Sequence, residues 1–167
     1  ALRTDLVATT DRPTLVNLGH HSYFNLDGSD DIRTHHLSIA ADHYLPADED
    51  CLPTGEIAPV AGTSFDFRHK REIAGSYDHN FCLADWRRPP APVAELFSPR
   101  SGVSMGLLTT EPGLQFYTGQ GLSGGGPGLG GPVNENVVRN RSNIGLRSSR
   151  WCCLFPPAPP DSLRLLG

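Results

Sequence analysis

Apolar and polar residues alternate over short stretches of this chain, and no long run repeats them with the period of a helix. Between residues 36 and 45, Leu37, Ile39 and Ala41 alternate with polar neighbours, which is typical of an antiparallel strand with one face in the core. Further short strands are predicted at residues 5–10, 14–18, 103–110 and 114–117. Turn signals at 53–55, 61–63 and 101–102 separate these runs, at a spacing that suits a β-sandwich or a barrel.

Composition supports this interpretation. The 167 residues, of which 38% are hydrophobic, suffice for one globular unit with an ordinary core. A charged fraction of only 19%, with 18 Gly and 15 Pro, favours a turn-rich β protein over a helical one. The net charge of -4 and the lack of a basic run give no reason to expect nucleic acid as a partner.

The cysteines and the apolar runs bear on the compartment. The four cysteines, at positions 51, 82, 152 and 153, lack the spacing of a zinc site, and adjacent cysteines rarely bridge each other. We interpret them as free thiols in a reducing compartment. The sequence has no apolar run long enough to span a membrane and no amino-terminal signal peptide, so a soluble, cytoplasmic protein without membrane contact is expected.

The composition changes near Gly119. Residues 121–167 contain nine Gly and six Pro, about a third of the segment, a level at which disorder is the better expectation. The segment carries five Arg against Glu135 and Asp161, whereas the preceding part is acidic. We therefore divide the chain into a partial β-sandwich domain, residues 1–120, and a divergent, Gly/Pro-rich tail, residues 121–167, which is predicted to be disordered.

Three motifs carry candidate chemistry. The run VNLGHHSYFNL, residues 16–26, places two histidines in an aromatic, strand-prone stretch. The run SYDHNFCL, residues 76–83, supplies a carboxylate beside another histidine, and EPGLQFYTG, residues 111–119, sets an amide between apolar residues of an expected strand. Three polar positions on one β-rich scaffold suggest a site for a polar small molecule.

These motifs, together with the run from Ala41 to Arg68, resemble in order and spacing the aldose 1-epimerases, the galactose mutarotases, over about residues 3–120. The resemblance implies an all-β fold, an antiparallel β-sandwich of the galactose mutarotase type with an open sugar cleft, incomplete in this chain. It also implies exchange of the α and β anomers of galactose, glucose and related aldoses in carbohydrate metabolism, with no cofactor and no metal. The implied partner is a small-molecule aldose; the oligomeric state is not predicted.

Anomer exchange needs an acid that protonates the ring oxygen and a base that removes the proton of the C1 hydroxyl, so that the ring opens and recloses. Histidine suits the acid because both of its protonation states are accessible near neutral pH. By match to the family's NHSYFNL motif, His21 is the implied acid. By the same kind of match, Asp78 of YDHN and Gln115 of PGLQFYTG are implied to bind sugar hydroxyls.

The chain also departs from the family pattern. His20 stands where the family usually carries Asn. The family's base, a glutamate in a block resembling CLETQ, has no counterpart here, and Glu135, the only glutamate after Gly119, lies in no comparable context and is not assigned the role. The family's upstream half is also absent, so the chain is expected to be a fragment. The alternative is a non-catalytic or unstable truncated isoform, at most a weak sugar-binding module.

Each candidate residue also has a structural interpretation. Asp78 alone suits a turn, since aspartate bonds to nearby backbone amides, and Gln115 alone suits an ordinary strand. A histidine in an aromatic strand is more often structural than catalytic. That interpretation is kept for His79, whereas for His21 the motif match argues against it. Only the joint order of the motifs favours function.

Other polar features are given structural roles. His35 and His36 are expected to be solvated loop or strand-edge residues, and the acidic run at 48–50 a solvated turn rather than a metal site. A third class of function, an interaction protein with residues 156–160 (PPAPP) as a polyproline ligand, rests on five residues of common composition.

Overall fold

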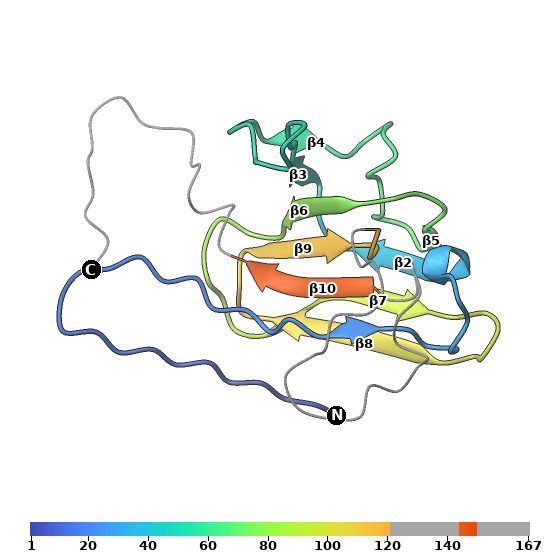
Figure 1. Ribbon diagram of the computed structural model, residues 1–167, viewed down its shortest axis with the longest axis horizontal. Coiled ribbons are helices and arrows are strands. Elements are labelled where there is room, and N and C mark those ends of the chain that lie inside the picture. The colour runs from blue at the N-terminus through green and yellow to red at the C-terminus, as the bar shows by residue number, and fades with distance from the viewer. Residues whose placement is uncertain (121–143, 150–167) are drawn as a thin grey trace.

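Two antiparallel sheets make up the computed structural model, which describes residues 1–120 and 144–149 (Figure 1). The six-stranded sheet has the order β1 (Tyr23–Phe24), β10 (Ile144–Ser149), β9 (Gly113–Tyr117), β6 (Asp78–Cys82), β3 (His43–Leu45), β4 (Ala58–Pro59). The four-stranded sheet has the order β5 (Arg71–Glu72), β2 (His36–Ile39), β7 (Ala91–Phe97), β8 (Ser104–Thr109). One 3-10 turn, η1 (Ile32–Thr34), precedes β2. The predicted all-β, antiparallel fold class is confirmed.

The core lies between the two sheets, and aromatic rings dominate its centre. On β9, Leu114 and Phe116 are fully buried, whereas Gln115 and Tyr117 alternate with them and point to the other face. The ring of Phe116 lies edge-on to that of Phe67, with 5.5 Å between their centroids. The inner face of the six-stranded sheet is therefore apolar, and the polar residues of β9 are left on its outer face.

Alternation correctly predicts several strands. In β2, Leu37 and Ile39 are at most 1% exposed while their neighbours are half-buried. The single run expected from 36 to 45 is divided, however, because β2 and β3 belong to different sheets. Gly62 and Gly102 adopt left-handed backbone angles, with φ of 74° and 71°, as turns that require glycine would have.

The strands predicted at 5–10 and 14–18 are wrong. Residues 1–22 contain no strand, and Leu15 is 95% exposed and Val7 87%. In Figure 1 this dark blue segment runs out beyond the sheets and returns to them at β1. Its apolar residues match a strand pattern, but a strand needs a hydrogen-bonded neighbour, and this segment has none among the described residues.

Strand β10 falls inside the segment that composition assigns to a disordered tail. It pairs with β1 on one side and with β9 on the other, so six residues of that segment belong to the sheet. A Gly/Pro average over the whole segment hides this short stretch. The division at residue 120 remains a prediction, since the rest of the segment, including Glu135, Cys152, Cys153 and residues 156–160, lies outside the described residues.

The prediction of a solvated His35 is also wrong. Its side chain is fully buried, and its Nε2 accepts a hydrogen bond of 3.2 Å from the backbone N–H of Leu26. Ser98, at the end of β7, donates a 2.7 Å hydrogen bond to Asp27, which lies 4.0 Å from the His35 ring. His36, by contrast, is half-buried in β2 beside Phe97.

Two smaller expectations hold for the described residues. The acidic run at 48–50 is exposed, as expected for a solvated turn. The thiols of Cys51 and Cys82 are free. No helix in this part of the chain has the length and apolar character needed to cross a bilayer.

Candidate functional site

Strand register brings Asp78 and Gln115 to one face of the six-stranded sheet. Asp78 pairs with Tyr117 and Asn80 with Gln115, across the antiparallel strands β6 and β9. Paired residues point to the same side of a sheet, and so do alternate residues along a strand, so these four side chains share the face opposite Phe116. We call Asp78, Asn80, Gln115 and Tyr117 the polar face.

Three polar side chains of this face form a hydrogen-bonded chain. Gln115 Nε2 donates to Asp78 Oδ1 at 2.7 Å. Asn80 Nδ2 donates to Gln115 Oε1 at 3.4 Å, and Asn80 is only 3% exposed. The structure thus brings together the two predicted binding residues, and a bond to a carboxylate is among the stronger neutral-to-charged contacts in proteins.

A cavity of about 190 Å³ opens beside this chain. Its walls include Asp78, Asn80 and Gln115 from the sheet, and Cys51 and Pro53 from the loop after β3. A hollow of this size, with one carboxylate and two amides on its wall, suits a small polyhydroxylated ligand better than an apolar one.

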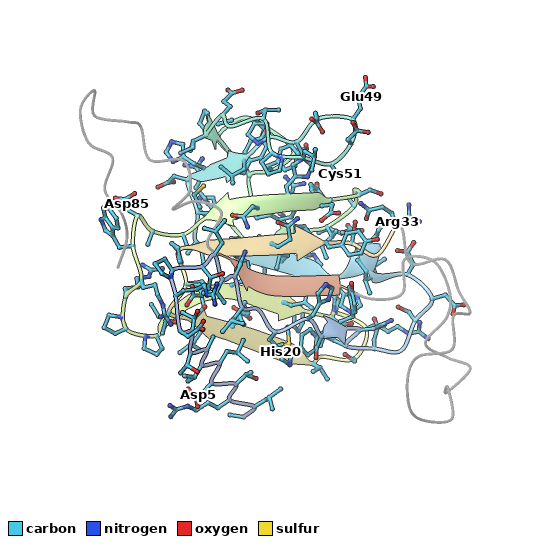
Figure 2. The ribbon with its side chains drawn as sticks, turned by 60° about the vertical axis from the view of Figure 1, so that its left-hand side comes forward. Asp5, His20, Arg33, Glu49, Cys51 and Asp85 are labelled. Carbon is cyan, nitrogen blue, oxygen red and sulfur yellow. The ribbon has the colours of Figure 1, made fainter. Side chains whose placement is uncertain are left out.

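The loop that closes one side of the cavity is held by hydrogen bonds between the Asp48 side chain and the loop backbone. Asp48 Oδ1 accepts hydrogen bonds from the N–H groups of Asp50 and Leu52, at 3.0 and 2.9 Å. Cys51 adopts φ of 61°, an uncommon conformation for a residue with a side chain. Figure 2 shows Glu49 pointing away from the molecule at this edge, while Cys51 lies nearer the strands.

The strand ends beside the polar face are also fixed. The backbone N–H of Tyr77 donates to Thr118 Oγ1 at 2.8 Å, and that of Thr118 donates to the Tyr77 carbonyl at 3.0 Å. Tyr77 is buried, and burial raises the pKa of its phenol despite the nearby Arg71 guanidinium. Because these bonds join the residues next to Asp78 and Tyr117, the register of β6 on β9 is well determined.

His21 lies elsewhere, at the exposed end of the segment that leads into β1. Its ring is 5.3 Å from that of Tyr23, and the Tyr23 ring is 6.2 Å from that of Tyr117, centroid to centroid. Two aromatic rings therefore connect His21 to the polar face. In the described part of the chain, His21 makes no hydrogen bond to Asp78 or Gln115.

His20 differs from its neighbour in its contacts. Its Nε2 lies 3.1 Å from the hydroxyl of Ser22, so it bonds within its own segment. In Figure 2, His20 and Cys51 lie near opposite edges of the six-stranded sheet, which matches the order of its strands from β1 to β4.

His79 packs against aromatic rings, and its structural role remains a prediction. Its ring centroid lies 4.6 Å from that of Phe65 and 6.0 Å from that of Tyr44. Burial lowers the pKa of His79, against the opposing effect of the Asp78 carboxylate. Its Nδ1 accepts a hydrogen bond from the Asp78 backbone at 3.2 Å, and His79 also lines the cavity.

Metal binding also depends on the side chains present. The described residues hold no group of three or more His, Cys, Asp or Glu side chains arranged to bind a metal ion.

Sequence reasoning missed Asn80, which has no role in the motif comparison. The period of two would have found it, since Asn80 follows Asp78 by two residues on one strand.

An antiparallel β-sandwich with a polar cavity on one sheet face is an arrangement that suits the binding of a small polar molecule. A family model described as aldose 1-epimerase matches residues 1–154, and the chain belongs to this family. The match continues past residue 120, where the sequence motifs end, and includes β10.

Individual relatives agree with this assignment. The galactose mutarotase of Rattus norvegicus is 41% identical over 169 residues, covering 94% of this chain and 48% of the relative. The galactose mutarotase of Homo sapiens is 43% identical, with the same coverage of 94% and 48%. The crystal structure of the GalM/aldose epimerase homologue from C. elegans superimposes with a TM-score of 0.69 at 25% identity, covering 88% of this chain and 48% of that one. The chain spans about half the length of these relatives.

Proposed function

We propose that this chain takes part in aldose 1-epimerase activity, the interconversion of the α and β anomers of galactose and related aldoses. The observation that carries the proposal is the hydrogen-bonded pair of Asp78 and Gln115 on the wall of a polar cavity. The motif match points to both residues without reference to their contact. Their union through strand register is independent support, and the names of the relatives point to the same activity.

In this proposal the two groups bind the sugar. The Asp78 carboxylate accepts hydrogen bonds from sugar hydroxyls, and the Gln115 amide donates to a sugar oxygen. Such groups discriminate among sugars, because a ligand that lacks a matching hydroxyl leaves a buried polar group without its partner. Asp78 and Gln115 therefore determine affinity and not the rate of ring opening.

His21 is the proposed general acid. It protonates the ring oxygen of the sugar while a base takes the proton of the C1 hydroxyl, and the open chain then rotates about C1–C2 before the ring recloses. A positioned acid contributes roughly 10²- to 10⁴-fold to such a step. Asp78, the only acidic residue lining the described cavity, is used for binding, so we assign the base to no described residue.

The proposed partner is an aldose, and the proposed compartment is the cytoplasm, in keeping with the free thiols of Cys51 and Cys82. No residue of the described part is proposed to hold a cofactor. The proposal makes no assignment of oligomeric state.

Polarimetry tests the activity. The purified 167-residue chain is mixed with freshly dissolved α-galactose, and the relaxation of optical rotation is compared with buffer and with the His21→Ala variant. A rate above both supports the proposal. Relaxation at the rate of buffer, by a chain whose dispersed NMR spectrum shows that it is folded, would reject turnover and leave at most a sugar-binding module.

Alanine substitutions test the division of roles. Asp78→Ala and Gln115→Ala are each expected to raise the dissociation constant for galactose by about tenfold, since each removes one or two hydrogen bonds to the sugar. Their rates at saturating sugar should change little. Loss of kcat in both variants with unchanged KM would contradict the binding role.

A further inference from the structure

Asn80 occupies a position that the proposed function does not use. It lies on β6, two residues after Asp78, and it is opposite Gln115 in the register of β6 on β9. It is 3% exposed, and its Nδ2 donates to Gln115 Oε1 at 3.4 Å. The buried Asn80 amide therefore contacts Gln115 at the end of its side chain that does not bond to Asp78.

The orientation of an amide side chain decides where it donates and where it accepts a hydrogen bond. The two ends of a glutamine amide have nearly the same shape, but the oxygen accepts hydrogen bonds and the nitrogen donates them. If the Gln115 amide turned by half a rotation, its oxygen would face the Asp78 carboxylate, which also only accepts. Asp78 and Gln115 would then face each other with two acceptors and no hydrogen bond between them.

Asp78 holds only the nitrogen end of the Gln115 amide. A carboxylate accepts several hydrogen bonds, so a sugar hydroxyl can donate to Asp78 while Gln115 Nε2 keeps its own bond. Asn80 bonds to the opposite end of the amide, at Oε1. The two contacts together determine which end of the amide faces Asp78.

We propose that Asn80 is a positioning residue that fixes the Gln115 amide with its nitrogen towards Asp78, so that the cavity presents one donor beside one acceptor to an aldose. One Nε2 proton is used by Asp78 and the other is directed to a sugar oxygen. The assignment of an aldose rests on the proposed function, but the orientation of the amide does not.

The test begins with Asn80→Asp, which keeps the size of the side chain and replaces its donor with an acceptor. The first readout uses the free chain, in which the ¹⁵N spectrum resolves the side-chain amide protons of Gln115. We expect the shifted proton that bonds to Asp78 to lose its shift in the variant. Unchanged Gln115 amide signals would overturn the proposal.

The second readout is the galactose affinity measured by NMR titration. Asn80→Asp should raise the dissociation constant about tenfold. Asn17→Asp is the matched control, since it makes the same change on an exposed residue and should leave the affinity unchanged. Equal affinities of Asn80→Asp and the unsubstituted chain would overturn the proposal.

A pH series separates positioning from a general structural defect. As the pH is lowered, the new carboxyl group at position 80, whose pKa is raised by burial and by the nearby Asp78 carboxylate, becomes protonated and regains an O–H donor for Gln115 Oε1. The ratio of dissociation constants between Asn80→Asp and the unsubstituted chain should then fall towards one. A ratio that stays constant with pH would contradict positioning by this donor.

The two proposals fail separately. If the Gln115 signals change as expected but the unsubstituted chain does not bind galactose, Asn80 orients the amide and the proposed function is wrong. If the unsubstituted chain binds galactose and Asn80→Asp binds it equally well, the proposed function stands and the role of Asn80 is wrong. Should the buried charge unfold the chain, Asn80→Ala removes the donor without adding charge and takes its place in both readouts.

Discussion

The polar face and the segment that ends at His21 are held in different ways. Asp78 and Gln115 lie on paired strands with buried neighbours on the opposite side of each, and their relative positions follow from register. His21 lies at the end of 22 residues without a strand, and its ring contacts the sheet through the aromatic rings of Tyr23 and Tyr117.

The difference teaches that the proposed binding groups and the proposed acid rest on separate structural supports. The pairing of β6 with β9 fixes the proposed binding groups relative to each other before a ligand arrives, which would lower the entropic cost of association. The proposed acid depends instead on β1, a strand of two residues. Substitutions on the polar face should therefore change the affinity for the sugar, and substitutions at His21 should change the rate. Substitutions in the core should lower the free energy of unfolding more than those on the surface.

The largest effect is expected from His21→Ala. Loss of the proposed acid should lower the rate of galactose mutarotation by about 10²- to 10⁴-fold, while the dissociation constant for galactose stays near that of the unsubstituted chain. Polarimetry and NMR titration measure the two quantities. His20→Ala is the matched control, since its ring bonds to Ser22 in the same segment, and it should retain most of the rate. Equal losses in both variants would show that the segment, and not the His21 imidazole, matters.

A comparable effect, on stability rather than rate, is expected from Phe116→Ala. Phe116 is fully buried, and it packs on Phe67 and Tyr77 from the inner face of β9. The cavity left by the ring should lower the free energy of unfolding by about 3–5 kcal/mol, as measured by urea titration. Leu108→Ala on β8, a residue that is 59% exposed, serves as the control and should cost far less. Similar losses in the two variants would contradict the placement of the core.

Strand β9, one of the two strands that carry the polar face, could be predicted from the sequence because its alternation is local, whereas β6 is not among the predicted strands. Residues 114–117 alternate apolar and polar side chains, and β9 spans Gly113–Tyr117 with Leu114 and Phe116 inside. Residues 14–18 are also rich in apolar side chains but form no strand, since pairing depends on a distant neighbour that the short run does not contain. Local alternation therefore predicts a tendency, and register decides the outcome.

The candidate site shows the same limit. Motifs identify Asp78 and Gln115 separately, but their 2.7 Å contact depends on the pairing of β6 with β9 across 37 positions of the chain. His35 was expected in solvent because it is polar and lies between Thr34 and His36. It is buried because Leu26 and Asp27 fold back onto it, which no short window of sequence contains.

A smaller effect, dependent on pH, is expected from Asp27→Asn. The Asp27 side chain is 2% exposed. Burial favours its neutral form, but hydrogen bonds from Ser29 and Ser98 outweigh burial and lower the pKa of Asp27 to about 2. A carboxyl group whose pKa is lowered by folding stabilises the folded protein at pH values above its ordinary pKa, which is near 3.8. This contribution is lost as the pH falls towards 2.

At pH 7, Asp27→Asn should therefore lower the free energy of unfolding by about 2 kcal/mol, and the difference from the unsubstituted chain should shrink below pH 4. Urea titrations at pH 7 and pH 3 measure it. Asp66, whose pKa the hydrogen-bonded Arg68 lowers to about 2, titrates in the same window, so some acid sensitivity remains in the variant. If the difference in the free energy of unfolding does not depend on pH, Asp27 stabilises the fold through packing and not through its charge.

The smallest effect is expected from Leu15→Ser, which tests the exposed segment directly. Leu15 is 95% exposed, so replacing it by a polar residue removes no buried apolar surface, and the free energy of unfolding should change by less than about 0.5 kcal/mol. The same change in a strand packed on the core would cost several times more. A loss above about 2 kcal/mol in urea titration would therefore place this segment on the sheet, and it would give His21 the same kind of support that the pairing of β6 with β9 gives to Asp78 and Gln115.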